Sequence, residues 1–233
     1  MKILIVAAMQ KELDLLLKQL SDCDKRAFEN IDIYVGNIHG HEVIASKCGI
    51  GKVNSALRTD ALIREFDPDL VINSGVAGGV DESMGIGDLL IPDSVSYHDV
   101  WCGPGTEYGA ADGYPVYFTP DIQIRTMLCD ACKQQGVKVK SGLICSGDKF
   151  ISTPEEVSVI KSKFAEARGC DMESASISQV CMMHGVKCLI VRVLSDRPGG
   201  GENLSEYKNF WNDAPARTFE AVSLLLKTLL ISK

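Results

Sequence analysis

The stretch that decides the fold is Asp69-Leu70-Val71-Ile72-Asn73, followed by Ser74-Gly75-Val76-Ala77-Gly78-Gly79. The apolar run at its start is short and rich in β-branched residues, as is typical of a strand buried on both faces of a sheet. Residues 52–66 before it have the pattern of a helix, which Asp67-Pro68 ends. The glycine-rich segment 74–79 predicts a turn. A helix followed directly by a buried strand is the unit from which α/β folds are built.

The same alternation extends along the chain in both directions. Segment 10–20 predicts a helix, because its leucines recur with helical spacing on one face. The other predicted helices are 121–135, 154–166, 173–184 and 214–231, and the other predicted strands are 2–8, 31–37, 42–48, 89–97, 137–146, 168–172 and 187–195. Segment 102–120 predicts a long loop of a kind that often covers a site. We therefore expect one domain, 1–233, of the α/β class, with three α/β/α layers and a mixed, mostly parallel central sheet.

Charge and hydropathy argue against two classes of partner. The net charge is −7 and the chain has no run of Lys or Arg, which opposes binding to a phosphate backbone, so we expect no nucleic-acid partner. No apolar run reaches the roughly 18 residues of a membrane-spanning helix, so we expect no membrane association. The apolar segment 3–9 is cut off by Gln10-Lys11-Glu12 and predicts a buried strand rather than a signal peptide. We therefore expect a cytoplasmic protein.

Cysteine and histidine usage does not predict a metal centre. The nine cysteines are an odd number scattered through apolar segments, which favours reduced, mostly buried thiols. Cys129-x-x-Cys132 lies in a predicted helix without a second ligand pair, so we interpret it as part of one buried helix face. The glycine motifs for phosphate and dinucleotide binding are incomplete. We expect neither a metal nor an organic cofactor.

Three acidic residues stand where apolar segments end. Glu12 follows the first predicted strand, Glu173 stands at the start of a predicted helix, and Asp196 follows the last predicted strand. Because a carboxylate is costly to bury, this repetition indicates acids gathered at one sheet edge for chemistry. The helix N-terminus is expected to favour the ionised form of Glu173. Each acid also has a structural alternative: Asp171 and Glu173 fit helix caps, Glu12 fits an exposed helix acid, and Asp196 fits a loop acid.

Six local motifs surround these acids in a fixed order. They are Ile5-Val6-Ala7-Ala8-Met9 with Glu12, Gly49-Ile50-Gly51-Lys52-Val53, Ser74-Gly75-Val76-Ala77-Gly78-Gly79, Ser146-Gly147-Asp148-Lys149-Phe150-Ile151, Asp171-Met172-Glu173-Ser174-Ala175, and Val191-Arg192-Val193-Leu194-Ser195-Asp196. Nearly end to end, this order resembles the nucleoside phosphorylase/nucleosidase superfamily, most closely its methylthioadenosine/S-adenosylhomocysteine nucleosidases. The resemblance implies a nucleoside phosphorylase-like fold and a homodimer.

The resemblance implies a separate role for each acid. Asp196 matches the general acid that protonates adenine N7, Glu12 matches the carboxylate that activates water, and Glu173 matches the acid that holds the ribose hydroxyls. Cleavage of a glycosidic bond passes through an oxocarbenium-like state that needs leaving-group protonation on one side and water on the other. Asp196 is therefore expected to carry a proton, which burial would favour, while Glu12 is expected to be ionised.

The resemblance also implies a set of substrate-binding residues. Met172 would pack under the ribose, Phe150 would stack on adenine, and the Ile151 backbone would read the base edge. Arg192 is a candidate for orienting the water or Glu12. The full set is Met9, Ile50, Ala77, Gly78, Phe150, Ile151, Met172, Arg192 and Ser195.

Water is favoured over phosphate as the nucleophile. Phosphorolytic relatives carry an arginine just before the glycine turn, where this chain has Ile72-Asn73-Ser74. The expected reaction is hydrolysis of the N-glycosidic bond of 5'-methylthioadenosine and of S-adenosylhomocysteine. The alternatives are an aminofutalosine-type adenine nucleosidase, a purine nucleoside phosphorylase, and a non-catalytic nucleoside-binding protein.

The chain also departs from the nucleosidase pattern. Gln10 and Lys11 stand where relatives have further acids, and Val76 stands where many have serine. In relatives, the loop after His98-Asp99 carries residues that a partner subunit lends to the pocket for the 5'-substituent. Here that loop contains Trp101, which fits either a pocket wall or simple packing.

Overall fold

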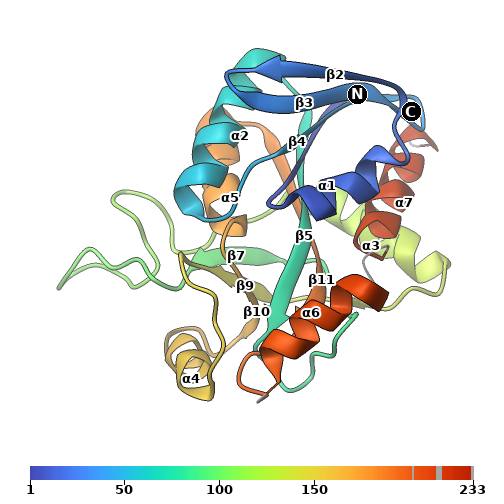
Figure 1. Ribbon diagram of the computed structural model, residues 1–233. Coiled ribbons are helices and arrows are strands. Elements are labelled where there is room, and N and C mark those ends of the chain that lie inside the picture. Colours follow the sequence, from blue (N-terminus) through green and yellow to red (C-terminus); the bar gives the residue numbers. More distant parts are fainter. Residues whose placement is uncertain (201, 214–216, 232–233) are drawn as a thin grey trace.

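The computed structural model describes residues 1–200, 202–213 and 217–231 (Figure 1). The helices are α1 (Gln10–Leu17), α2 (Lys52–Phe66), α3 (Ile122–Gln134), α4 (Pro154–Lys163), α5 (Ser174–His184), α6 (Asn203–Asp213) and α7 (Arg217–Ile231). The strands are β1 (Lys2–Ala7), β2 (Ser21–Phe28), β3 (Ile31–Ile38), β4 (His41–Lys47), β5 (Leu70–Gly79), β6 (Leu89–Leu90), β7 (Ser94–Tyr97), β8 (Val139–Lys140), β9 (Leu143–Ser146), β10 (Ala167–Asp171) and β11 (Lys187–Asp196).

Strand β5 is the centre of the sheet. It pairs in parallel with β1 on one side and with β11 on the other, and its last two residues pair with β10 in the antiparallel direction. Of the ten strand pairings among the described residues, the six parallel ones are β1 with β4, β1 with β5, β10 with β9, β11 with β5, β6 with β8 and β7 with β9. This confirms the expected α/β class with a mixed, mostly parallel sheet.

The alternation of side chains along β1 explains why helices cover both faces of the sheet. Ile3 and Ile5 pack into a core shared with α1, α3 and α7, whereas Leu4 and Val6 pack into a second core shared with α2 and α5. Successive residues of a strand point to opposite faces, so a strand that is apolar throughout needs a helical layer on each side. Figure 1 shows α2 and α5 on one side of the sheet and α1, α3 and α7 on the other.

The sheet places the ends of four strands at one location. Strands β1, β5 and β11 run in parallel, so their carboxyl ends meet at the same edge. Strand β10 approaches from the opposite direction, with Cys170 paired to Gly78 at the end of β5. The residues that directly follow or end these strands therefore converge, although they are far apart in the sequence.

The glycine-rich segment 74–79 does not form the predicted turn. It continues strand β5 to Gly79, because β11 supplies hydrogen-bond partners on one side and β10 at the end. The small side chains serve close packing instead: a Cβ on Gly75 would lie 2.8 Å from Glu12 Oε1, and one on Gly78 would lie 2.7 Å from Pro198 Cγ. The prediction of a turn at 74–79 is therefore wrong, because the segment is extended.

Two elements were missed in the sequence. Strand β2 has an almost fully exposed side-chain pattern and pairs only with β3 among the described residues, so it carries no apolar alternation to reveal it. Helix α6 follows a turn at residues 198–200. The predicted last helix, 214–231, corresponds to α7 over 217–231, and its residues 214–216 lie outside the described residues. Helix α6 packs beside β11 and contributes residues to the site described below.

The cysteines behave as expected. All nine are free thiols, and six of them are buried, with Cys23 and Cys102 exposed. Cys132 is buried and Cys129 half-buried on α3, as one helix face predicts. Over the part of the chain that the structure describes, no helix combines the length and apolar character needed to cross a bilayer.

Candidate active site

A cavity of about 620 Å³, partly open to solvent, lies where the strand ends converge. It is lined by Ala8, Met9, Glu12, Ile50, Val76, Ala77, Gly78, Lys149, Phe150, Ile151, Cys170, Asp171, Met172, Glu173, Ser195, Asp196, Pro198 and Tyr207. The mixture of apolar walls with a few carboxyl groups is typical of a small-molecule site. All three acids singled out in the sequence contribute to one cavity.

Glu12 is held by backbone donors from two elements. Its Oε2 accepts a hydrogen bond from the Met9 N–H at 2.8 Å, and its Oε1 accepts one from the Val76 N–H at 3.1 Å. The first bond belongs to the capping of α1, and the second reaches across to β5. Burial raises the pKa of Glu12, while these two bonds and the positive charges of Arg192 and Lys11 act in the opposite direction. These donors and charges counter only part of the effect of burial, so the pKa of Glu12 stays above its ordinary value.

Asp196 reaches the cavity because β11 is irregular at its end. Leu194 pairs with Ala77 and Asp196 pairs with Gly78, so Ser195 is an extra residue in the strand. Such a bulge lets two adjacent side chains reach the same side of a sheet. The Ser195 hydroxyl donates to Asp196 Oδ1 at 2.6 Å, with Ala77 O as a weaker acceptor at 3.4 Å.

Burial raises the pKa of Asp196, as expected for a general acid. Hydrogen bonds from Ser195 and from the Asn203 amide act in the opposite direction. The group is 2 % exposed, so most of its surface contacts protein atoms. This combination is suited to holding and delivering a proton.

Glu173 is the residue before α5, but its side chain does not cap that helix. Its Oε1 instead accepts a hydrogen bond from the Gly51 N–H at 2.9 Å, at the N-terminus of α2. Burial, followed by the nearby charge of Asp171, raises the pKa of Glu173. The expectation that a helix N-terminus favours its ionised form is therefore outweighed by desolvation and like charge.

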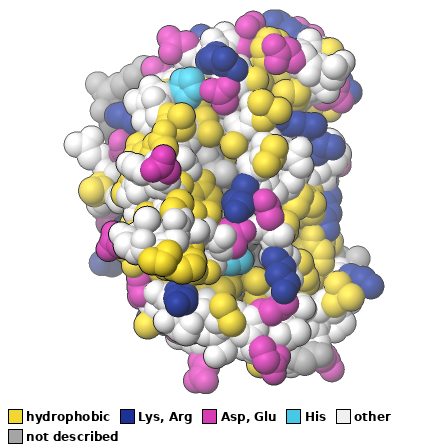
Figure 2. Space-filling model, turned by 90° about the vertical axis from the view of Figure 1, so that its left-hand side faces the viewer, with side chains coloured by type: hydrophobic (Ala, Val, Ile, Leu, Met, Phe, Trp, Pro, Cys, Tyr) yellow, Lys and Arg dark blue, Asp and Glu magenta, His cyan; other side chains and the backbone are white. Residues whose placement is uncertain are grey.

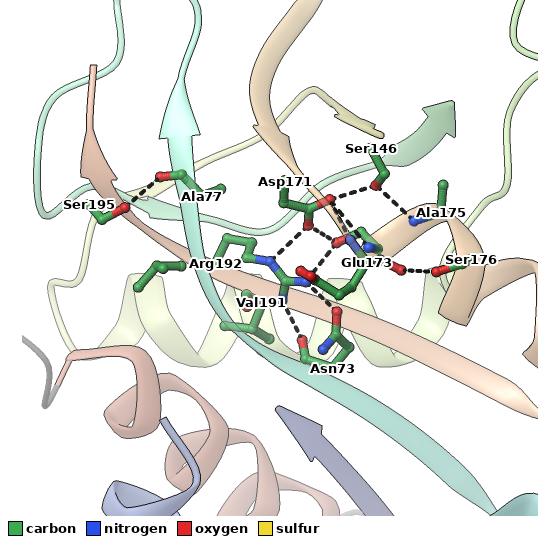
Figure 3. A network of polar contacts seen from close by, with 12 residues as sticks. Asn73, Ala77, Ser146, Asp171, Glu173, Ala175, Ser176, Val191, Arg192 and Ser195 are labelled. Carbon is green, nitrogen blue, oxygen red and sulfur yellow. Dashed lines mark hydrogen bonds and ion pairs between the residues drawn. The ribbon is translucent and has the colours of Figure 1, made fainter. Parts of the chain in front are cut away.

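Asp171 caps α5 in place of Glu173. Its Oδ1 accepts hydrogen bonds from the backbone N–H groups of Glu173 at 3.3 Å and of Ser174 at 3.2 Å, and from the Ser146 hydroxyl at 2.5 Å. Figure 3 shows this network beside Glu173. The helix-cap alternative considered for this segment thus holds for Asp171 but not for Glu173.

Arg192 lies below the cavity rather than in its wall. Its Nε donates to Asp171 Oδ2 at 3.0 Å, and one terminal nitrogen donates to the carbonyl oxygens of Asn73 at 3.1 Å and Val191 at 3.0 Å. The other terminal nitrogen donates to the Asn73 side-chain oxygen and to the Ser174 hydroxyl. A guanidinium has five N–H donors, and all five are used by the protein (Figure 3).

The structure therefore does not place the Arg192 guanidinium group to contact a substrate, the water or Glu12. Its side chain is 2 % exposed and its ion pair with Asp171 is fully buried. Its positive charge still acts at a distance, since it opposes the rise in the pKa of both Glu12 and Glu173. The other eight predicted substrate-binding residues, from Met9 to Ser195, all line the cavity.

Sequence reasoning missed the contribution of α6. Tyr207 lines the cavity, donates a hydrogen bond to Met9 Sδ at 3.3 Å, and packs edge-on to Phe150 with ring centroids 5.8 Å apart. Lys11 Nζ lies 3.7 Å from the ring centroid of Trp211 and 4.7 Å from that of Tyr207. The apolar spacing of Tyr207, Phe210 and Trp211 was the signal available, but the glycines before it masked the helix.

The loop after His98-Asp99 lies outside the described cavity wall. Trp101 is 57 % exposed and does not line the cavity, and no residue of 102–120 does so among the described lining residues. In the described ranges of the chain, no group of three or more His, Cys, Asp or Glu residues is placed to hold a metal ion.

A family model described as the phosphorylase superfamily matches residues 2–227. The chain belongs to the phosphorylase superfamily. Within it, the chain is 38% identical over 229 residues to the 5'-methylthioadenosine/S-adenosylhomocysteine nucleosidase of Halalkalibacterium halodurans, covering 98% of this chain and 99% of that protein. This confirms the resemblance found in the order of the motifs.

Solved structures of the superfamily show the same fold. The S-adenosylhomocysteine nucleosidase of Streptococcus pyogenes, in complex with 5-methylthiotubericidin, matches with a TM-score of 0.94 and 32% identity, over 98% of this chain and 97% of that one. The futalosine hydrolase of Helicobacter pylori matches with a TM-score of 0.91 and 27% identity, over 96% of each chain. The superfamily fold is thus shared by nucleosidases that differ in substrate.

Proposed function

We propose that the chain hydrolyses the N-glycosidic bond of 5'-methylthioadenosine and of S-adenosylhomocysteine, releasing adenine and the 5-thioribose. The single observation that carries this proposal is the convergence of Glu12, Glu173 and Asp196 on one apolar cavity. Full-length similarity to proteins with this named activity supports the choice of substrate class. The chain needs no metal or organic cofactor for this chemistry, because its own acids supply both proton transfers.

Each acid has an environment that suits its proposed role. Asp196 is buried and its raised pKa favours the protonated form, which can donate to adenine N7 and make the base a better leaving group. Glu12 is oriented by the backbone of Met9 and Val76 and is the base that takes a proton from water. Glu173 binds the ribose hydroxyls, and the positive charge developing on the sugar favours its ionised form.

The cavity wall supplies the remaining contacts with a nucleoside. Phe150 is 44 % exposed at the cavity and is free to stack on a base, while Met172 lines the wall beside Glu173. Ile50, Ala77 and Gly78 also line the cavity, and Met9 and Ser195 are hydrogen-bonded to Glu12 and Asp196.

Water is the proposed nucleophile rather than phosphate. An orthophosphate site needs cationic donors with free N–H groups, and all five of Arg192 are occupied. Lys149, the cation among the described lining residues, pairs with Glu156 at 2.7 Å on the open side. Product analysis decides the point: free 5-thioribose with or without phosphate supports hydrolysis, whereas a sugar 1-phosphate formed only with phosphate contradicts it.

A second substrate is favoured by one observation, the match to a futalosine hydrolase at a TM-score of 0.91. An adenine-bearing futalosine precursor would present the same base and ribose with a different 5'-substituent. Comparing kcat/KM for this compound, 5'-methylthioadenosine and S-adenosylhomocysteine ranks the candidates. A higher kcat/KM for the futalosine precursor would reassign the physiological substrate without changing the reaction.

The acids are tested by conservative substitution. Glu12→Gln, Glu173→Gln and Asp196→Asn are each expected to lose most adenine release while keeping the far-UV circular dichroism spectrum of the parent. Retained activity in Asp196→Asn would remove the proposed general acid. A parent chain that binds adenine but releases none from any nucleoside would favour the non-catalytic binding protein.

We also propose that the chain is one domain, 1–233, that acts in the cytoplasm as a homodimer. The exposed α2 residues Val53 and Leu57, 75 % and 65 % exposed, continue the apolar surface from Ile50 at the cavity. Figure 2 shows hydrophobic side chains gathered on the side of the molecule that carries α2. Leu57→Glu is expected to convert the dimer to a monomer in sedimentation velocity, and a monomeric parent chain would contradict the proposal.

A further inference from the structure

Asn203, the first residue of α6, contacts two parts of the cavity wall through one nitrogen atom. Its Nδ2 donates to Asp196 Oδ2 at 2.7 Å and lies 3.3 Å from the Ile151 carbonyl oxygen. The side chain is 5 % exposed, and both bonds are buried. A primary amide nitrogen carries two hydrogens in one rigid plane, so these two acceptors use both. No motif in the sequence pointed to this residue.

The two acceptors belong to different elements of the cavity wall. Asp196 ends β11, and Ile151 lies in the loop between β9 and α4. Both line the cavity. Adenine presents an acceptor at N7 next to a donor at its exocyclic amine, so its edge matches a protonated carboxyl group beside a carbonyl oxygen. A single amide that fixes both groups would set the geometry for reading the base.

Asn203 also completes the hydrogen bonding of Asp196. The Ser195 hydroxyl occupies Oδ1 and the Asn203 amide occupies Oδ2, so the carboxyl plane is fixed from two elements, β11 and α6. Gly78 leaves room on the remaining side, because a Cβ there would lie 3.3 Å from Oδ2 and 2.7 Å from Pro198. A carboxyl group that is held at both oxygens is pre-oriented before the substrate arrives.

We propose that Asn203 is a positioning residue for the reaction, which orients the Asp196 carboxyl group and couples base recognition to the docking of α6. The proposal rests on the proposed function, since it assigns Asn203 to the same proton transfer. In this role Asn203 contacts neither the nucleophilic water nor the ribose of the substrate. It acts through Asp196 and Ile151. When α6 moves away from β11, Asp196 loses one of its two fixed partners, so the acid is fully oriented only while α6 is docked.

The pH dependence gives a readout that a merely structural role would not change. The Asn203 hydrogen bond favours the carboxylate form of Asp196, so its loss moves the pKa of Asp196 upward. The charged and titratable groups around Asp196 are Glu206 and Tyr207 on α6 and Cys170 on β10, and Arg197 is paired with Glu206 at 2.9 Å. None of these is altered by a change at Asn203.

The test compares Asn203→Ala with Asn209→Ala, a matched control at an exposed position on the same helix. Because a general acid works while protonated, kcat/KM falls as pH rises through its pKa. In Asn203→Ala we expect this alkaline limb to move to higher pH and kcat to fall on the order of tenfold, because the acid is no longer held in the orientation for proton transfer. Asn209→Ala is expected to match the parent in both.

Asn203→Asp supplies the rescue. A protonated aspartic acid has nearly the shape of asparagine and donates one O–H to Asp196, whereas an ionised one repels it. The ratio of kcat for Asn203→Asp to kcat for Asn203→Ala is therefore expected to rise as pH is lowered. Adenine affinity, measured by calorimetry, is expected to fall in Asn203→Ala as well, which tests orientation without turnover.

The outcomes separate this proposal from the proposed function. A parent chain that releases no adenine overturns the proposed function. An active parent whose Asn203→Ala variant keeps the kcat, adenine affinity and pH profile of the parent overturns the positioning role alone. A variant that only lowers the thermal unfolding midpoint, with those three readouts unchanged, also overturns it.

Discussion

The carboxylate of Glu12 lies directly against Gly75, with Oε1 2.8 Å from the point that a Cβ would occupy. The two residues belong to α1 and β5, and they approach this closely because the Val76 N–H binds the same oxygen at 3.1 Å. Gly75 has no unusual backbone angle that would call for glycine. Its lack of a side chain is instead what allows a buried carboxylate to sit on the strand.

Gly75→Ala is therefore expected to displace the Glu12 carboxylate while leaving the fold intact. The clashing atoms are the end of a flexible side chain, so Glu12 can move away at little cost in stability. A misplaced base lowers kcat by a factor on the order of 100. The measurement is the initial rate of adenine release, alongside the thermal unfolding midpoint.

Gly85→Ala serves as the matched control, because a Cβ there meets only Asp88 Oδ2 at an ordinary 3.6 Å. Its kcat is expected to equal that of the parent. Should Gly75→Ala retain full kcat, Glu12 would not need its present position for the reaction.

Arg192 gives a prediction about stability rather than substrate binding. Arg192→Met removes the cation from a buried ion pair and takes one donor from Asp171 and from Asn73, so the free energy of unfolding is expected to fall by about 3–5 kcal/mol. Urea denaturation monitored by circular dichroism measures this. The exposed pair of Arg64 with Asp60 supplies the comparison, since Arg64→Ala is expected to cost only about 0.5 kcal/mol. Equal losses in the two variants would contradict a structural role for Arg192.

The fold and the three acids were accessible from sequence because both rest on local apolar runs. A buried parallel strand such as β11 is continuously apolar, and the first acid after it stands out. The bulge that turns both Ser195 and Asp196 to the cavity leaves no such mark. Arg192 was assigned to the site by the family resemblance, but its charge is matched by Asp171, whose partners come from three other elements.

Helix α6 shows a different limit. Its contribution depends on contacts between residues nearly 200 positions apart, such as Tyr207 with Met9. Local patterns cannot report such contacts. The ionisation of Glu173 was misjudged for a related reason, because the helix dipole is a local feature whereas burial is set by the whole fold.

Lys11 links α1 to α6, and its removal is expected to affect both α6 and Glu12. Lys11→Met keeps the apolar stem but loses the cation over Trp211 and Tyr207. This cation–π contact contributes about 1 kcal/mol to the docking of α6, so its loss is expected to raise KM. Lys11 also helps to hold down the pKa of Glu12. A base must be ionised to act, so the acid limb of the pH–rate profile is expected to move to higher pH.

Full pH profiles of kcat/KM and kcat measure both effects of Lys11→Met. Lys208→Met, an exposed lysine on α6, is the control and is expected to leave KM and the acid limb in place. An unchanged acid limb in Lys11→Met would show that its charge does not reach Glu12.

The raised pKa of Glu173 makes the stability of the free protein depend on pH. Because the folded-state pKa lies above its ordinary value of 4.5, the folded protein binds more protons than the unfolded chain between those two values. The resulting stabilisation is complete below the ordinary value and is lost as pH rises through the folded-state pKa. Glu12 and Asp196 contribute with the same sign, since burial raises both of their pKa values.

Glu173→Gln removes one of these three contributions, so its thermal unfolding midpoint is expected to fall less steeply with rising pH than that of the parent. Glutamine has nearly the same shape and carries no charge at any pH, so packing is preserved. Glu42→Gln, at an exposed position on β4, is the control and should reproduce the slope of the parent. Parallel slopes for Glu173→Gln and the parent would mean that Glu173 ionises as readily in the folded protein as in the unfolded chain. In that case, Glu173 would become a carboxylate without any positive charge on the sugar.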